Sequence, residues 1–190
     1  MKKQLFKLLS FLMVTAFFVA CAPKGETVST NEDTSNSSHP LGQASVVDEE
    51  SDKNILQVAI SSEAHSTLVA AVQAAQIEHV LVNAGPLTVF APVNDAFNAL
   101  PEGTVENLLK PENKTQLATI LTRHAAPGSY DLEALKREAR KGRKLYMATG
   151  DYLEIVVDND KVTVGGAEII ATVPTSNGII QVVNKVILPN

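Results

Sequence analysis

The sequence TVFAPVNDAFNALP, residues Thr88–Pro101, is the stretch from which the fold of this chain can best be predicted. Its first three residues, Thr88 to Phe90, are β-branched or aromatic and suit a buried strand. Pro92 lacks the backbone N–H that a sheet needs, and it favours an extended conformation in the residue before it. We therefore expect a strand that ends near Pro92, followed at once by a corner.

A short helix is predicted directly after this corner. Asn94 or Asp95 can accept a hydrogen bond from the free N–H groups of the first helical turn, which is the role of an N-cap. Residues 96–100 then direct Phe97 toward the core at helical spacing, and Pro101 ends the helix. We expect Asn94 and Asp95 to hold the corner rather than to contact a ligand.

This stretch resembles the first signature motif of the fasciclin domain, a family of extracellular adhesion and ligand-binding modules. The segment Asn177–Pro189, NGIIQVVNKVILP, resembles the second signature, which lies at the end of that domain. The resemblance covers about residues 54–190. The motif residues to which we assign a structural role are Thr88, Phe90, Pro92, Asn94, Asp95, Phe97, His124, Asn177, Gly178 and Pro189.

A third family feature, a Tyr-His pair before a Val-Pro-Gly run, is half present. Arg123-His124 stands in its place, ahead of residues AAPG. The resemblance links this pair to receptor binding in animal members, but Arg123 replaces the tyrosine here. The other interpretation is a partly buried His124 whose ring nitrogens bond to the backbone, and we favour that structural role.

The pattern of apolar residues predicts an α+β fold. Helical spacing recurs over residues 55–62, 68–75, 77–81, 105–109 and 117–121, whereas strands are expected at 88–90, 146–149, 153–158, 162–164, 169–173 and 179–188. The family resemblance implies in addition a twisted β-sandwich or wedge of about seven strands with a packed helical layer.

The N-terminus predicts export. Lys2, Lys3 and Lys7 accompany the apolar run of residues 5–20, which is short for a membrane span. The following FVAC, ending at Cys21, resembles a bacterial lipoprotein cleavage box, so we expect signal peptide 1–20 and a lipid on Cys21. Ordinary secretion is the alternative, because Ala20-Cys21-Ala22 also fits a small-residue cleavage site.

Residues 21–53 are predicted to be a disordered tether between the lipid anchor and the domain at 54–190. The segment is rich in Ser, Thr, Asn, Asp and Glu and has few residues that could form a core. The whole chain has a formal net charge of −5, which argues against a nucleic-acid partner, because phosphates require a basic surface. We expect a protein lipid-anchored to the bacterial cell envelope, at the outer membrane or cell surface.

A basic span, LEALKREARKGRK at residues 132–144, contrasts with the acidic chain. It is either a solvated helix face or a patch for an acidic partner, such as a polysaccharide or lipid headgroup, in which Arg137, Arg140 and Lys141 take part. No aromatic residue interleaves with these charges, so single-stranded nucleic acid would find no stacking platform.

The sequence contains no motif that predicts catalysis, a cofactor or a metal. His65 and His79 are expected on helix surfaces without a ligand partner, and Asp158-Asn159-Asp160 fits a turn better than a calcium loop. The resemblance implies a non-catalytic adhesion or ligand-binding module for an extracellular matrix, glycan or cell-surface partner. A small-ligand carrier, or an enzyme with a spatially assembled site, is the alternative, and a deep apolar pocket would favour it.

Overall fold

The computed structural model describes residues 52–83 and 85–189, and these belong to one compact unit. The predicted signal peptide, Cys21 and nearly all of the predicted tether lie outside the described residues. A chain of residues 39–190 contains every described helix, strand and hydrophobic cluster.

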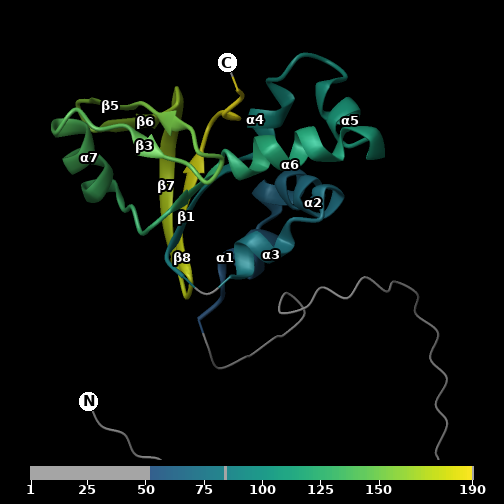
Figure 1. Cartoon of the computed structure of the whole chain (residues 1–190), viewed down its shortest axis with the longest axis horizontal. Coiled ribbons are helices and arrows are strands. Elements are labelled where there is room, and N and C mark those ends of the chain that lie inside the picture. The colour runs from purple at the N-terminus through teal and green to yellow at the C-terminus, as the bar shows by residue number, and fades with distance from the viewer. Residues whose placement is uncertain (1–51, 84, 190) are drawn as a thin grey trace, which may run out of the picture. The chain divides into compact units, whose positions relative to one another are not determined.

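Helices dominate the first half of the described chain (Figure 1). They are α1 (Ile55–Ile60), η2 (Glu63–His65), α2 (Ser66–Ala75), α3 (Glu78–Val82), α4 (Asn94–Asn98), α5 (Thr104–Leu108), η3 (Pro111–Asn113) and α6 (Lys114–Thr122), with α7 (Leu132–Arg140) following later. Asn54 begins the first helix through a reciprocal pair of hydrogen bonds with Gln57, each side chain accepting from the other's backbone N–H at 2.9 Å.

The strands form a six-stranded mixed sheet with the order β2-β1-β8-β7-β6-β5 and a separate β3–β4 pair. Their bounds are β1 (Leu87–Pro92), β2 (Ala125–Pro127), β3 (Leu145–Tyr146), β4 (Tyr152–Leu153), β5 (Ile155–Asp158), β6 (Lys161–Val164), β7 (Ala167–Thr175) and β8 (Gly178–Val183). Among the strands of the described residues, only β1 and β8 pair in parallel. Helices combined with this sheet confirm the α+β prediction.

The two signature stretches lie side by side as β1 and β8, and neither of these strands is at the edge of the sheet (Figure 1). Val89 of β1 is opposite Ile180 of β8, and both face the cluster formed with the helices. Phe90 and Val183 face the opposite cluster, beneath α7 and the strands β3 to β6. We call the paired strands β1 and β8 the seam. Because both strands are buried on both faces, the seam joins the two hydrophobic clusters of the core.

Gly178 is required by the close approach of these two strands. A Cβ atom at this position would lie 1.9 Å from the Leu87 carbonyl oxygen, which is backbone and cannot move aside without disturbing the β1–β8 pairing. The glycine of the second signature therefore has a steric explanation.

The prediction that Asn94 or Asp95 caps the helix after the corner is wrong. Val93 occupies the N-cap position of α4, its carbonyl accepts from the Ala96 N–H at 2.9 Å, and no side chain caps the helix. Pro92 ends the strand as expected, but Asn94 is already the first helical residue. Its side chain is consequently available to other segments.

Three predicted strands are shorter than expected. The final strand ends at Val183 instead of residue 188, because the Asn184 side chain accepts the Glu168 N–H at 2.9 Å and the chain then leaves the sheet. The predicted strand 153–158 is divided at Glu154 between β4 and β5, and its end is exposed rather than half-buried. The strand expected at 146–149 is reduced to β3 by a turn.

Candidate functional site

Two motif asparagines connect helices to the sheet. Asn94 Oδ1 accepts the Thr67 N–H at 3.0 Å, so it satisfies a free donor in the first turn of α2, and its Nδ2 donates to the Glu63 carbonyl at 2.9 Å. Asn177 acts similarly at the other end of the seam. Its Oδ1 accepts the Ile55 N–H at 3.0 Å, and its Nδ2 donates to the Leu81 carbonyl at 2.8 Å.

Gln181 is fully buried in β8, and both ends of its amide are hydrogen-bonded. Its Oε1 accepts the Thr172 hydroxyl at 2.7 Å, and its Nε2 donates to the Tyr130 carbonyl at 2.9 Å. Thr88 of β1 holds the same loop, since its hydroxyl donates to the Gly128 carbonyl and accepts the Tyr130 N–H, each at 2.8 Å. These motif side chains use their polar groups inside the domain.

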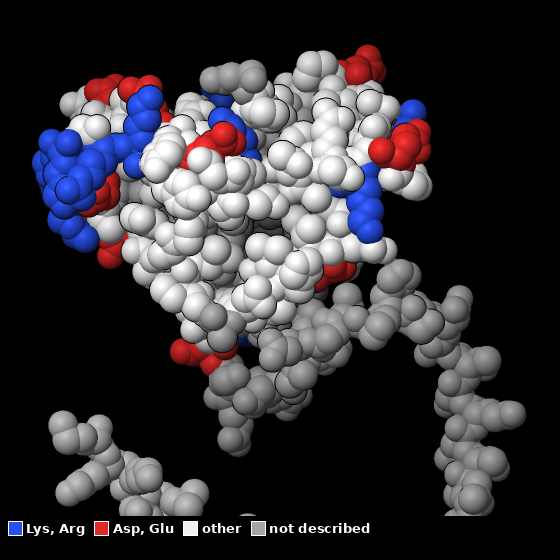
Figure 2. Space-filling model, viewed as in Figure 1, with Lys and Arg blue, Asp and Glu red and all other residues white. Residues whose placement is uncertain are grey.

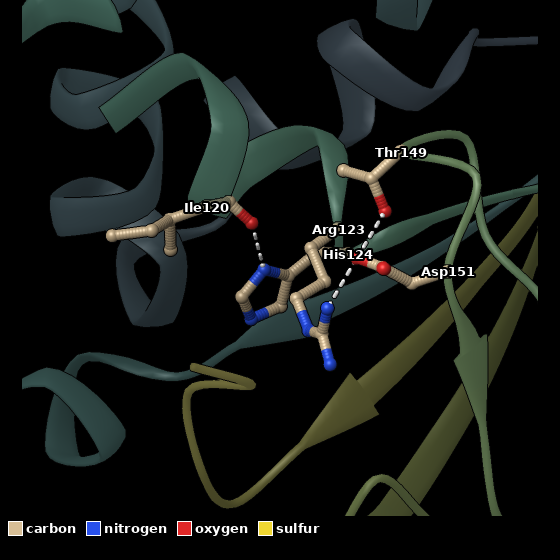
Figure 3. Close-up of polar contacts among 5 residues, drawn as sticks. All are labelled: Ile120, Arg123, His124, Thr149 and Asp151. Carbon is tan, nitrogen blue, oxygen red and sulfur yellow. Dashed lines mark hydrogen bonds and ion pairs between the residues drawn. The ribbon is translucent and has the colours of Figure 1, made fainter. Parts of the chain in front are cut away.

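His124 follows α6 and is only 2% exposed. Its Nδ1 lies 2.8 Å from the Ile120 carbonyl, which can only accept (Figure 3). The Ile187 N–H donates to its Nε2 at 2.9 Å. These partners fix the neutral tautomer with the proton on Nδ1. Burial lowers the pKa of His124 to about 4, with Arg123 adding to the shift and the Ile120 hydrogen bond opposing it.

Arg123 turns the other way, toward the loop between β3 and β4. Its guanidinium forms an ion pair with Asp151, whose carboxylate also accepts the Thr149 hydroxyl at 3.1 Å (Figure 3). Arg123 also lines a cleft of about 360 Å³ together with Lys144, Tyr152 and Glu154. Because acidic and basic groups both lie in and beside this cleft, it has no clear preference for ligand charge.

The basic residues of the span 132–144 gather over α7 and the residues after it, at the left of Figure 2. Part of this charge is neutralised locally. Lys136 pairs with Glu133 at 3.2 Å, and Glu138 pairs with both Lys141 and Arg143, at 3.0 and 3.2 Å. The hydrogen bond from Lys141, followed by that from Arg143, lowers the pKa of Glu138 despite some desolvation.

Arg137 and Arg140 differ from these paired residues. Both are exposed, and neither forms an ion pair with any residue of 52–83 or 85–189. Their spacing of three residues places them on one face of α7. Of the predicted patch Arg137, Arg140 and Lys141, the structure therefore leaves the two arginines available to a partner and engages the lysine with Glu138.

The expectation that His65 lies on a helix surface is wrong, because this residue is only 8% exposed. It ends η2 and lines an apolar cavity beneath α1 and α2. The sequence does contain a pattern that indicates this burial. His65 has helical spacing with Leu68, Val72 and Ala75, which puts it on the buried face of the α2 segment. His79 is exposed on α3, as expected.

Within residues 52–83 and 85–189, no group of three or more His, Cys, Asp or Glu side chains is placed to hold a metal ion. In the same part of the chain, no helix is long and apolar enough to cross a membrane.

The family model described as Fasciclin domain matches residues 63–189. This chain belongs to the fasciclin domain family. Protein sll1483 of Synechocystis sp. is 42% identical to it over 96% of each chain. Immunogenic protein MPB70 of Mycobacterium bovis is 30% identical over 80% of this chain and 76% of its own length.

Longer proteins contain a similar region. Transforming growth factor-beta-induced protein ig-h3 of Sus scrofa is 38% identical over 65% of this chain, which corresponds to 17% of the pig protein. Among solved structures, a FAS1 domain pair from the insect cell adhesion molecule Fasciclin I matches 69% of this chain and 43% of the insect chain, with a TM-score of 0.42 and 17% identity.

Most of the site residues predicted from the sequence of this fasciclin domain lie in one of two separate places. The motif residues Thr88, Phe90, Pro92, Asn177 and Gly178 lie along the β1–β8 seam, with Asn94 and His124 beside it. Asp95 and Pro189 are exposed. Arg137 and Arg140 lie on α7, across the second hydrophobic cluster from the seam.

Proposed function

We propose that this fasciclin domain is a non-catalytic binding module, held at the cell envelope by a lipid on Cys21, whose α7 face binds an acidic extracellular surface such as an anionic glycan. The pair Arg137 and Arg140 carries the proposal. Both side chains are exposed on one face, and no acidic residue of the described chain neutralises them.

The charge distribution supports a specific orientation of this encounter. The chain is acidic overall, but residues 131–144 contain six basic and three acidic side chains. An acidic surface is therefore repelled by much of the molecule and attracted by the α7 face, which favours binding in one orientation. Exposed ion pairs are individually weak, so many anchored copies acting together would be needed for firm attachment.

The test is attachment of beads, densely coated with residues 39–190, to surfaces bearing a carboxylated or sulfated polysaccharide. We expect attachment that decreases as salt rises, because exposed charges are screened. The variant Arg137→Glu/Arg140→Glu should weaken binding about tenfold, since it replaces two attractions with two repulsions, each of about 0.2–1 kcal/mol.

A matched control is Lys53→Glu/Lys110→Glu, which changes net charge equally at two exposed lysines outside the α7 span. Equal losses in both variants would show that only net charge matters and would contradict a role for the α7 face. Attachment no better than that of beads coated with an unrelated acidic protein would refute the binding function itself.

A further inference from the structure

A cavity of about 80 Å³ lies between the helices α1 and α2 and the strands β1, β8 and β7. Its walls are aliphatic, with side chains such as Leu56, Val72, Val89 and Ile180 facing inward. The cavity is partly open to the surface. Two polar residues, Ser62 and His65, contribute to its lining.

One ring nitrogen of His65 has a well-aligned hydrogen bond, and the other does not. Nδ1 lies 2.8 Å from the Ser62 hydroxyl. Nε2 is buried and forms no hydrogen bond of normal length and angle within the described residues, although the Ala91 backbone is close enough to the ring to raise its pKa. A buried polar atom without a partner destabilises the fold, and native proteins rarely contain one without a reason. Because His65 lines an otherwise apolar cavity, a partner for Nε2 can come from a molecule that enters it.

The chemistry of that partner follows from the ring. Ser62 can donate to Nδ1 or accept from it, so Nε2 is either a donor or an acceptor. A hydroxyl group can pair with both tautomers. Burial lowers the pKa of His65, opposed by the Ala91 backbone, so the ring is neutral at neutral pH and offers no charge to a carboxylate.

The size of the cavity limits the apolar part of the ligand. A closed cavity of about 150 Å³ is large enough to bind benzene. The enclosed space here is roughly half as large, which suits a chain of a few carbon atoms whose remainder can extend toward the opening. We propose that this cavity is a binding site for a short-chain aliphatic alcohol, or for the hydroxyl-bearing end of a longer aliphatic molecule, with its hydroxyl on His65 Nε2.

The probe is 1-butanol, compared with 1-chlorobutane, which keeps the chain but lacks the hydroxyl. Both are titrated into ¹⁵N-labelled residues 39–190 and followed by NMR. We expect saturable shifts confined to amides of α1, α2, β1 and β8, together with a shift of the His65 Nε2 resonance for the alcohol alone.

The variant His65→Leu separates hydrogen bonding from simple apolar filling. It should change the ratio of the two dissociation constants about tenfold in favour of 1-chlorobutane, because one buried hydrogen bond is lost. His79→Leu, a substitution of the exposed histidine on α3, should leave the ratio unchanged. If His65→Leu does not fold, the Nε2 resonance of the unaltered protein still decides the question.

Three results would overturn the proposal. The first is the absence of saturable shifts in α1, α2, β1 and β8. The second is a ratio of dissociation constants that His65→Leu leaves unchanged. The third is an Nε2 resonance that reports a hydrogen bond to a buried water and does not respond to the alcohol.

Discussion

His124, at the end of α6, has a backbone partner on each ring nitrogen, whereas His65, just before α2, has a well-aligned hydrogen bond on one nitrogen only within residues 52–83 and 85–189. Both rings are buried, and burial lowers the pKa of both. The difference lies in what surrounds them. His124 borders an apolar cavity of about 20 Å³ between α6 and the chain after β8, whereas the cavity beside His65 is about 80 Å³.

The comparison shows that burial alone does not assign a histidine to a structural or a binding role. A ring with both nitrogens committed to backbone groups has nothing left to offer a ligand, so His124 cannot take the receptor-binding role that the family resemblance raised unless the fold opens. A ring with one uncommitted nitrogen can still bind. The predictions below test this distinction.

The largest effect is expected from His124→Leu. The substitution puts an apolar side chain of similar size in place of the ring. It leaves the Ile187 N–H and the Ile120 carbonyl without their hydrogen-bond partners. We expect the free energy of unfolding to decrease by about 4 kcal/mol at neutral pH. Urea unfolding of residues 39–190 measures it, with the exposed His79→Leu as control. A loss below about 1 kcal/mol would show that the two ring hydrogen bonds of His124 contribute little to the stability of the domain.

Acid should remove nearly as much stability. The His124 pKa is lowered to about 4 in the folded domain against about 6.5 in the unfolded chain, so the unfolded chain binds the extra proton first. Stability attributable to His124 is therefore complete above pH 6.5 and decreases by about 3 kcal/mol as the pH falls to 4.

The measurement is urea unfolding between pH 7 and pH 4 for the native chain and for His124→Leu. Carboxylates titrate in both proteins, so the difference between them isolates the histidine. That difference should shrink from about 4 to about 1 kcal/mol across this range. A constant difference would mean that His124 is accessible to protons in the folded state, which contradicts its buried, doubly bonded geometry.

The smallest effect is expected at the surface next to His124. Asp151→Asn removes the ion pair with Arg123, but the aspartate side chain is 52% exposed. Solvent and salt weaken such a pair, so we expect a loss of about 0.2–1 kcal/mol that disappears in roughly 1 M salt. Thermal unfolding at low and high salt measures it. A larger, salt-independent loss would show that Asp151 also supports the buried histidine.

The sequence was sufficient for those elements whose cause is local. Pro92 ends a strand through its own chemistry, and the helical spacing of the segments before and after it predicts α2 and α6 correctly. The structural role of Asn94 was expected, but its geometry was not, because its partners Thr67 and Glu63 belong to a segment about thirty residues earlier.

Distant contacts also explain the other errors. The last strand ends at Val183 because Asn184 meets Glu168 and because Ile187 continues on to His124, and neither pairing is visible in the alternation of apolar residues. His65 was misplaced because Glu63, Ser66 and Thr67 beside it are polar, although its helical spacing with the buried residues of α2 already indicated burial. On α7 the sequence identified the basic residues, but only the structure separates Arg137 and Arg140 from the paired lysines.

The parallel seam of β1 and β8 has a consequence for the order in which the domain forms. The Asn177 amide and the Leu81 carbonyl that it binds are 96 residues apart in the chain, so the contact closes a very long loop. Closing such a loop carries an entropic cost before any stabilising contact is made, and domains rich in such contacts fold slowly. Strand β1 lacks one of its neighbours until β8 arrives, and during synthesis its unpaired backbone edge stays available to other chains. Proteins that assist folding would have to protect that edge until the second signature is in place.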